Sequence, residues 1–312
     1  MLISDLSPQT NTPEQDIQAL NSEQIPQEAF DWYDEYAHGE INRRTFINRL
    51  GTLGMVGLSL SVLTSALTPN YALAEQVSFN DSDITASYLT FASPQGYQEG
   101  KGYLVTPNKV STAPAVLVIH ENRGLNPYIK DVARRLAKAG FVAFAPDALH
   151  PLGGYPGNDD EGRRKQKTLD RSKIEADFMA AAKMLKVHAA SSGKLGVVGF
   201  CFGGYASNML AARLPNVIDA AVPFYGTPPK ENIIKNIKAP LLLQFAQLDK
   251  RVNASWPAYE KALKANAVDY QAYIYEKANH GFHNDSTGRY VENQAELAWS
   301  RTLAFFNKHL QT

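Results

Sequence analysis

The only cysteine of the chain lies in a glycine-flanked turn that could present it as a nucleophile. Residues 199–203 read GFCFG, directly after a short apolar run and directly before a stretch with helical spacing. A nucleophile on a sharp strand-to-helix turn needs small neighbours two residues away on each side, and Gly199 and Gly203 meet that need. The turn also aims a helix N-terminus at the side chain, which favours a thiolate and a developing oxyanion. We therefore predict that Cys201 is a nucleophile; the alternative is a buried structural cysteine.

Two further side chains could complete a catalytic triad. A cysteine nucleophile needs a base, and the base needs a group that orients it. Asp249 and His280 each follow an apolar run of strand length, and they come after Cys201 in the order acid, then histidine. This order, with each residue on a loop after a strand, is that of the α/β-hydrolase fold. We predict Asp249 and His280 as the partners, with His283 as the alternative base; an isolated loop Asp is more often a turn residue.

Strand and helix patterns alternate from residue 84 to the C-terminus, and they must position these side chains. The predicted strands cover 84–91, 102–105, 115–119, 141–145, 195–198, 220–224, 240–245 and 270–275, and the predicted helices cover 129–139, 174–185, 203–213, 256–265 and 294–309. Such alternation predicts an α/β-hydrolase fold with a mainly parallel central sheet and helices on both faces, after an antiparallel first pair of strands. Residues 149–168 are Gly-rich and charged, which predicts a long surface loop.

The composition excludes several classes of protein. The chain has 312 residues, of which 44% are hydrophobic and 20% are charged, as in ordinary globular proteins. No basic stripe is interleaved with aromatic residues, so nucleic acid is not expected as a partner. The usual glycine-rich nucleotide-binding motifs are missing. A single cysteine excludes an intramolecular disulfide, a C-x-x-C redox pair and a cysteine-rich zinc site. We expect no cofactor and no metal.

The net charge of zero hides an uneven N-terminus that divides the chain into three parts. Residues 1–40 carry nine acidic and no basic residues, and we predict a poorly ordered segment there. Residues 41–74 contain Arg43 and Arg44, an uncharged stretch and an A-x-A end, a pattern that resembles a twin-arginine export signal. Residues 75–312 form the predicted α/β-hydrolase domain, with 28 basic and 22 acidic residues.

The signal pattern predicts export, with the periplasm as the destination and the export machinery as a partner. The mature chain would then begin near Glu75 and would have no stable membrane partner. One alternative is an uncleaved membrane anchor formed by residues 50–67, a stretch at the lower limit of length for spanning a bilayer. A second alternative is a buried core helix.

One segment makes the resemblance to a known family specific. Residues 119–125 read IHENRGL, and they are followed by GF at 140–141 and APD at 145–147. Together with the GFCFGG turn, this is similar to the dienelactone hydrolase family over roughly residues 85–310. The resemblance implies a triad of Cys, Asp and His, and a glutamate, here Glu121, that pairs with the thiol region in the resting enzyme. It also implies that the backbone N–H groups of Asn122 and Phe202 hold the oxyanion.

The resemblance has one gap, which bears on the substrate. Dienelactone hydrolases proper hold the substrate carboxylate with two arginines, and neither of the matching regions of this sequence contains one; Arg123, Arg251 and Arg289 are possible substitutes. We therefore predict a thiol hydrolase that cleaves a small-molecule ester or lactone through an acyl-enzyme. The alternatives are a thiol redox or sensor protein, which would lack a resolving cysteine, and a non-catalytic binding module on the same scaffold.

Overall fold

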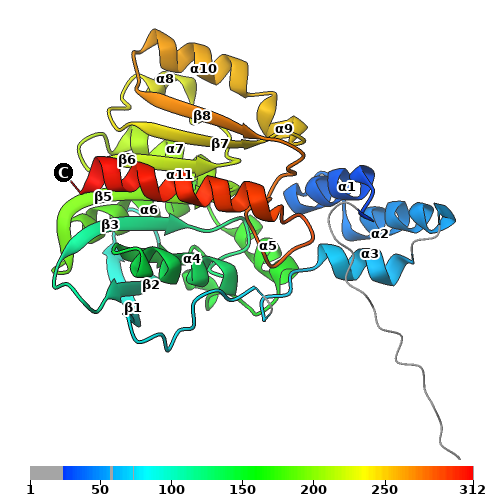
Figure 1. Ribbon diagram of the computed structural model, residues 1–312, viewed down its shortest axis with the longest axis horizontal. Helices are drawn as coiled ribbons and strands as arrows, with labels where there is room; N and C mark the ends of the chain where they lie inside the picture. The colour runs from blue at the N-terminus through cyan, green and yellow to red at the C-terminus, as the bar shows by residue number, and fades with distance from the viewer. Residues whose placement is uncertain (1–23, 57–58, 73, 312) are drawn as a thin grey trace, which may run out of the picture.

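The computed structural model describes residues 24–56, 59–72 and 74–311. One eight-stranded sheet forms its centre (Figure 1). The strands are β1 (Ile84–Ser93), β2 (Gln98–Pro107), β3 (Ala113–Ile119), β4 (Val142–Pro146), β5 (Ser191–Phe200), β6 (Ala220–Phe224), β7 (Leu241–Ala246) and β8 (Tyr270–Tyr275). Their order in the sheet is β1-β2-β4-β3-β5-β6-β7-β8. The β1–β2 and β2–β4 pairs are antiparallel and all other neighbours are parallel, so the predicted sheet is confirmed.

Helices cover both faces of this sheet, as predicted. The helices of the α/β domain are α4 (Pro127–Lys138), α5 (Asp159–Thr168), α6 (Arg171–Lys186), α7 (Phe202–Arg213), α8 (Glu231–Ile234), α9 (Lys250–Asn253), α10 (Trp256–Ala265) and α11 (Glu292–Leu310). Apolar side chains of α6, α7 and α10 pack in one hydrophobic cluster, and those of α4 and α11 pack in a second cluster on the other face. Strands β3, β4, β6 and β7 are almost fully buried between the two, because they consist of continuous apolar runs.

The long surface loop that we predicted over residues 149–168 is wrong in its second half. A short 3₁₀ turn, η3 (His150–Leu152), is followed by the ten-residue helix α5. The side chain of Asn158 caps the first turn of α5 by accepting a hydrogen bond from the Glu161 N–H at 3.0 Å. Acidic residues in the first turn and lysines in the last match the helix dipole. This helix therefore depends on capping and charge placement, and it lacks the apolar stripe that predicts most helices.

The N-terminal residues also differ from the prediction, because residues 24–40 are packed rather than poorly ordered. They form α1 (Gln27–His38), which is followed by α2 (Arg43–Thr52), the 3₁₀ turn η2 (Leu53–Val56) and α3 (Leu60–Leu67). Aromatic residues spaced along α1 supply the packing, since Phe30, Tyr33 and Tyr36 join Phe46 and Leu50 in a separate small hydrophobic cluster. The Tyr36 and Phe46 rings stack with centroids 5.0 Å apart. The sequence prediction missed this apolar face because it was based on the acidic composition of the segment. Residues 1–23 of the predicted disordered segment lie outside the described residues.

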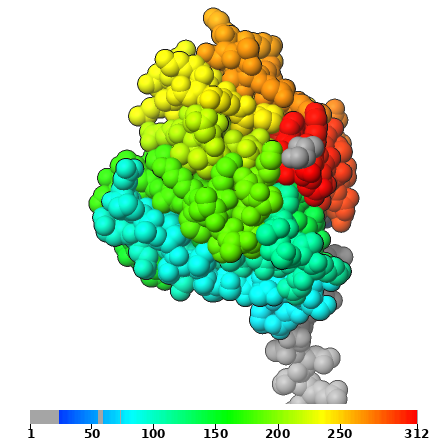
Figure 2. Space-filling view, turned by 90° about the vertical axis from the view of Figure 1, so that its left-hand side faces the viewer, coloured from blue at the N-terminus to red at the C-terminus, as the bar shows by residue number. Residues whose placement is uncertain are grey.

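These N-terminal helices lie at the end of the sheet where the parallel strands terminate. In Figure 1, α1 is next to α9 and the loop after β8, on the right-hand side of the view. Figure 2 shows the molecule from the opposite end. Residues coloured cyan to red form the surface there, and none of the blue residues of α1 and α2 is seen on it. In an open α/β sheet, ligands bind outside the carboxyl ends of the strands. Helix α1 therefore occupies the position where a substrate would be expected.

No helix among the described residues is long and apolar enough to cross a membrane. The uncharged stretch 50–67 does not form one continuous helix, because α2 ends at Thr52 and α3 begins at Leu60.

Candidate active site

The nucleophile turn has the sharp geometry that its glycines predict. Strand β5 ends at Phe200 and α7 begins at Phe202, so Cys201 alone makes the turn, with φ of 57° and ψ of −110°. A Cβ atom on Gly199 would overlap the carbonyl group of Gly203, and a Cβ on Gly203 would overlap the carbonyl of Ile119. Both positions therefore require glycine for close approach of the backbone, and the strained Cys201 conformation is typical of a functional position.

Asp249 and His280 meet beside this turn, as predicted. Asp249 follows β7 and His280 follows β8, and the two loops are joined by a backbone hydrogen bond from Leu248 to Ala278 at 3.0 Å. The Oδ2 atom of Asp249 lies 2.6 Å from Nδ1 of His280. The Nε2 atom of His280 is buried and has no hydrogen-bond partner among the described residues. This places the proton on Nδ1 and leaves Nε2 free to act on the sulfur of Cys201.

The electrostatics of the pair favour an ion pair of thiolate and imidazolium. Burial alone would lower the pKa of His280, but the carboxylate of Asp249 and the sulfur of Cys201 raise it to about 10. Burial also opposes ionisation of Cys201, yet His280 and His38 hold its pKa well below the usual value. Each charge supports the other, as expected for two groups that titrate as a unit.

His283, the alternative base, is not placed for that role. Its Nδ1 lies 2.7 Å from the hydroxyl of Tyr128, and its ring stacks on Phe200. Burial, assisted by the charge of Arg135, lowers the pKa of His283 to about 3. The ring is therefore neutral and packed in the core below the triad.

The residues that follow β3 lie on the other side of the turn. Glu121 is 2% exposed, and its Oε2 accepts a hydrogen bond from Asn284 at 3.3 Å. The Asn122 side chain donates to the main-chain carbonyl of Ala37 in α1 at 2.8 Å. Phe202 is the first residue of α7, so its N–H group has no acceptor within the helix. The backbone N–H groups of Phe202 and Asn122 remain our predicted oxyanion donors.

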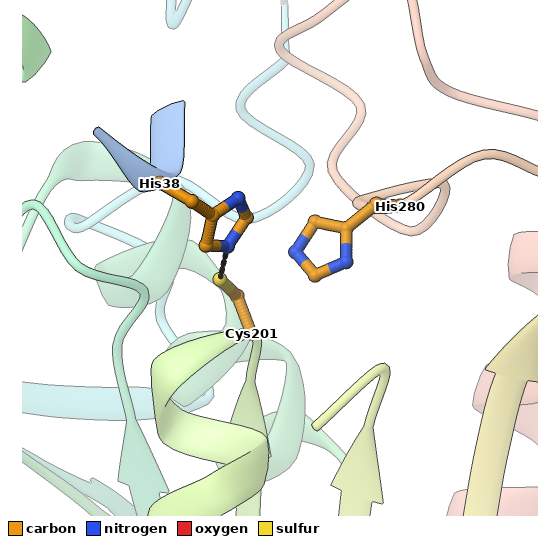
Figure 3. A group of neighbouring side chains, drawn as sticks. All are labelled: His38, Cys201 and His280. Atoms are coloured by element: carbon orange, nitrogen blue, oxygen red, sulfur yellow. Dashed lines mark hydrogen bonds between the residues drawn. The ribbon is translucent and has the colours of Figure 1, made fainter. Parts of the chain in front are cut away.

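His38 is the site residue that sequence reasoning missed. It is the last residue of α1, and its Nε2 lies 3.5 Å from the Sγ of Cys201 (Figure 3). Its ring stands nearly perpendicular to that of His280, with centroids 5.1 Å apart. The sequence gives only weak signals for this role of His38. They are the aromatic residues spaced along an acidic segment and the position of His38 directly before Gly39.

The partners of His38 define its tautomer. Its Nδ1 lies 2.8 Å from the main-chain carbonyl of Asp34 and 3.2 Å from that residue's carboxylate, so Nδ1 donates a proton. Burial would lower the pKa of His38, whereas Cys201 and Asp34 raise it to about 9. However, Nη2 of Arg251 lies 2.8 Å from Nε2 and can donate only to an unprotonated nitrogen. The raised pKa favours a protonated His38 that donates through Nε2 to the thiolate, and the Arg251 contact applies only to the neutral form.

Helix α1 is fastened over the triad by polar contacts along its length. Gln27 donates to Asn279 at 2.6 Å, directly before His280. Asp31 forms an ion pair with Lys250 at 2.9 Å, and Asp34 forms one with Arg251 at 3.2 Å. As a result, Cys201 is only 9% exposed.

The three arginines considered as substitutes for the carboxylate-binding pair lie in different surroundings. Arg123 is buried in an ion pair with Asp159 at 2.8 Å, and Arg251 contacts α1. Arg289 donates through Nη1 to the carbonyl of His280 at 3.0 Å, and its guanidinium lies 4.7 Å from the Tyr33 ring centroid. The Nε and Nη2 atoms of Arg289 are buried without a hydrogen-bond partner among the described residues.

A cavity of about 900 Å³ lies next to the predicted oxyanion amides. His38, Asn122 and Phe202 contribute to its wall, and helices α2, α5 and α6 supply most of its charged residues. Several of these cations are already paired, since Arg163 contacts Asp160 at 3.3 Å and Arg171 contacts Glu175 at 3.4 Å. The cavity is large enough for a small-molecule ligand.

Two family models match parts of the chain. Residues 101–310 match the model of the dienelactone hydrolase family, and residues 18–54, which include α1 and α2, match a family described as YqhI-like. "Putative hydrolase fragment YghX" of Escherichia coli (strain K12) is 62% identical over 109 residues, which cover 35% of this chain and 93% of that protein.

A longer relative and a solved structure extend the likeness. "Probable 2-oxo-3-(5-oxofuran-2-ylidene)propanoate lactonase" of Bradyrhizobium sp is 35% identical, over 67% of this chain and 89% of the relative. The crystal structure of "Putative Dienelactone Hydrolase from Klebsiella pneumoniae subsp. pneumoniae MGH 78578" is 25% identical, with a TM-score of 0.62 over 72% of this chain and 99% of that one. The α/β-hydrolase fold and the ester- or lactone-directed hydrolase class both follow from these matches, and the chain belongs to the dienelactone hydrolase family.

Proposed function

We propose that the protein hydrolyses a small-molecule ester or lactone through an acyl-enzyme on Cys201. The observation that carries this proposal is the 2.6 Å contact between Asp249 and His280, which leaves Nε2 of His280 unpartnered beside the sulfur. An oriented base with a free nitrogen, next to a thiol whose pKa is lowered, is the arrangement that nucleophilic catalysis requires.

The chemistry would proceed in two halves. The Cys201 thiolate attacks the carbonyl carbon, and the backbone N–H groups of Phe202 and Asn122 hold the developing oxyanion. The protonated His280 then gives its Nε2 proton to the leaving alkoxide, which leaves a thioester on Cys201. In the second half, His280 takes a proton from water, the resulting hydroxide attacks the thioester, and the thiolate is restored. Asp249 keeps the ring in the correct tautomer throughout.

Glu121 would control the resting thiol. The family resemblance implies that this carboxylate lies near the sulfur at rest and moves when substrate binds. Asn284 holds Glu121 by one hydrogen bond at 3.3 Å, which is a weak restraint for a buried carboxylate. A negative charge close to Cys201 disfavours a second negative charge on the sulfur.

A burst experiment tests the proposed reaction. The full chain is mixed with p-nitrophenyl acetate, and the variants Cys201→Ser and Cys201→Ala are measured alongside. We expect a burst of p-nitrophenol equal to the enzyme concentration that both substitutions abolish, with His309→Ala, at the far end of α11, as a variant that retains it. An equal burst in Cys201→Ala would refute the assignment of the nucleophile.

The substrate is proposed to be neutral. The two arginines that hold a carboxylate in dienelactone hydrolases are not matched, and Arg123 and Arg251 are engaged in ion pairs. Neutral esters or lactones should therefore be turned over at least as well as dienelactone. A kcat/KM for dienelactone that is about tenfold above every neutral substrate, or about 1.4 kcal/mol of preference, would contradict this proposal.

One observation favours a second candidate, a carboxylate-bearing substrate. Arg289 is buried 9 residues after His280 with two unfilled donors, and Tyr33 of α1 covers it. If α1 moves aside, Arg289 would be the cation available to a carboxylate near the triad. Matched substrates that differ only in a free acid or its methyl ester distinguish the candidates. A preference for the acid that is lost in Arg289→Gln supports the second.

We also propose that residues 1–74 form an export segment that covers the site until it is removed. Arg43 is 70% exposed, as recognition by an export machinery requires, and Ala72 and Glu75 are exposed on either side of the proposed cleavage point. Twin-arginine signals export folded proteins, so the site would already be formed before export, and residues 1–74 would slow the access of substrate to Cys201 without abolishing it. The periplasm would then be the place where it acts.

The non-hydrolytic alternatives make different predictions. A redox or sensor protein would form no acyl adduct but would change on oxidation of Cys201, and a binding module would show neither reaction. Intact mass after incubation with a panel of esters and lactones, and separately with peroxide, distinguishes the three.

A further inference from the structure

We propose that His38, Cys201 and His280 form a site for a thiophilic divalent cation of the Zn²⁺ type in the uncleaved chain. One candidate ligand atom from each residue lies within 4.8 Å of the other two, and all three side chains point toward a common centre (Figure 3). Two imidazoles and a thiolate are donors that zinc prefers. Only Cys201 and His280 belong to the proposed hydrolase triad; His38 comes from α1, outside the dienelactone hydrolase match.

The atoms that face the centre become ligands when the two Nε2 protons are lost, as metal binding requires. Nδ1 of His280 donates to Asp249 and Nδ1 of His38 donates to Asp34, so both Nε2 atoms are directed at the sulfur. Metal-binding histidines commonly donate their other nitrogen to a carboxylate or a backbone carbonyl in this way. Nε2 of His280 is also a buried nitrogen with no partner among the described residues, which is unfavourable unless a proton or a cation occupies it.

The separations suit a small cation. With bonds of about 2.3 Å to sulfur and about 2.0–2.1 Å to nitrogen in a tetrahedral site, the sulfur and a nitrogen are about 3.5 Å apart. The Nε2 of His38 is 3.5 Å from Sγ. The Nε2 of His280 lies within 4.8 Å of both other atoms, so a small movement of its ring toward the sulfur would complete three bonds, and a fourth position would remain for water.

The surrounding charges favour a divalent ion, with one competitor. The carboxylates of Asp34 and Asp249 each contact the Nδ1 of one of the two imidazoles, so with the thiolate three negative charges surround the centre. Arg251 opposes binding, because its Nη2 lies 2.8 Å from the Nε2 of His38 that would become a ligand. Arg251 also donates to the carboxylate of Asp34 at 3.2 Å. This contact would remain when the hydrogen bond from Arg251 to His38 is broken. On binding, the Nε2 protons of His38 and His280 leave to solvent.

A site of this kind has a consequence for α1. The cation would join the end of α1 to the nucleophile turn and to the β8 loop, so it would hold the cover closed while it occupies the nucleophile and the base. Removal of residues 1–74 would delete one ligand and release the cation. The inference does not depend on the proposed hydrolysis, since binding is measured without an ester.

Cobalt titration of the full chain tests the site. Co²⁺ bound to a thiolate gives a near-ultraviolet charge-transfer band, and Zn²⁺ added afterwards should abolish it. We expect one Co²⁺ per chain, a band lost in Cys201→Ser, and an affinity at least tenfold weaker in His38→Ala. The control His309→Ala, at the opposite end of the molecule, should bind like the unchanged chain. No band in the full chain, or an unchanged affinity in His38→Ala, would overturn the proposal.

A second variant guards against misfolding of His38→Ala. Arg251→Met removes the competing donor and a positive charge, so it should bind Co²⁺ at least threefold more tightly. Equal or weaker binding by this variant would contradict the site. A full chain that binds Co²⁺ as described but forms no acyl-enzyme would leave this inference intact while rejecting the hydrolase proposal.

Discussion

The Nε2 atom of His38 lies 3.5 Å from the Sγ atom of Cys201, although the two residues are 163 positions apart in the sequence. The contact connects a helix outside the dienelactone hydrolase match to the centre of the predicted active site. It also means that the resting thiol is covered by a histidine from α1, while Glu121 accepts a hydrogen bond from Asn284. Access to the sulfur therefore depends on the position of α1.

Replacing His38 should expose the thiol. In His38→Ala we expect iodoacetamide to alkylate Cys201 roughly fivefold faster or more at pH 7, because the side chain that covers the sulfur is gone while His280 still supports the thiolate. The rate is measured by intact mass against time, with His309→Ala as the control. A rate that is unchanged or lower would show that His38 does not restrict access.

The grouping of Cys201, Asp249 and His280 could be predicted from the sequence because each of these residues has a local signal. Cys201 has glycines on both sides, and Asp249 and His280 follow apolar runs that become adjacent parallel strands. The carboxyl ends of such strands meet at one edge of the sheet, so spacing alone brings the side chains together.

His38 had no such signal, because its position depends on tertiary packing of a separate helical cluster. The acidic residues of α1 read as a solvated segment, yet Asp31 and Asp34 pair with Lys250 and Arg251 of the domain. The hydrogen-bond partner of Glu121 and the position of Arg289 likewise could not be predicted from the sequence. They are set by loop conformation after β8, where hydrogen bonds rather than periodicity decide the structure.

The pH dependence of alkylation should report the ion pair. An ordinary thiol with a pKa of about 8.5 reacts roughly 75-fold faster at pH 8 than at pH 6. The pKa of Cys201 is held well below the usual value, so its thiolate persists at pH 6 and the rate should change less than about threefold over this range. The rate should fall only as the pH drops through the lowered pKa.

His280→Ala tests the cause of that behaviour. Without the imidazolium, burial of Cys201 is no longer outweighed, and the steep dependence between pH 6 and pH 8 should return. His309→Ala is the control, because His309 is half-buried in the last turn of α11, away from the Cys201 turn, and its loss should leave the profile flat. An equally flat profile in His280→Ala would show that another group ionises the thiol.

Glu121→Gln tests control of the resting thiol by the carboxylate. Removing the negative charge should lower the apparent thiol pKa further, so the acid-side fall in the alkylation rate should move to lower pH, and the half-life of the activity in peroxide should shorten. Asn284 can still bond to the amide, so the loop should remain in place. Alkylation and inactivation rates within about twofold of the unchanged chain would exclude this role. A rise in the thiol pKa would show instead that Glu121 helps to ionise Cys201.

Processing of the N-terminus should depend on the arginine pair. The exported protein is expected to begin near Glu75, and Arg43→Lys combined with Arg44→Lys should stop export, as for a twin-arginine signal. N-terminal sequencing of the exported fraction gives the answer. A mature protein that retains residues 1–74, or export that is unaffected by the double substitution, would mean that α1 is a permanent part of the enzyme.

The central claim is that Cys201 carries an acyl group during turnover. The most direct measurement is rapid quenching of the full chain with a slowly hydrolysed ester, followed by intact mass and peptide mapping. We predict one acyl group per chain, located on the peptide that contains Cys201, formed more slowly in His280→Ala and absent in Cys201→Ala. An ester that is turned over while no acyl group forms on Cys201, or an adduct on another residue that persists in Cys201→Ala, would contradict the account.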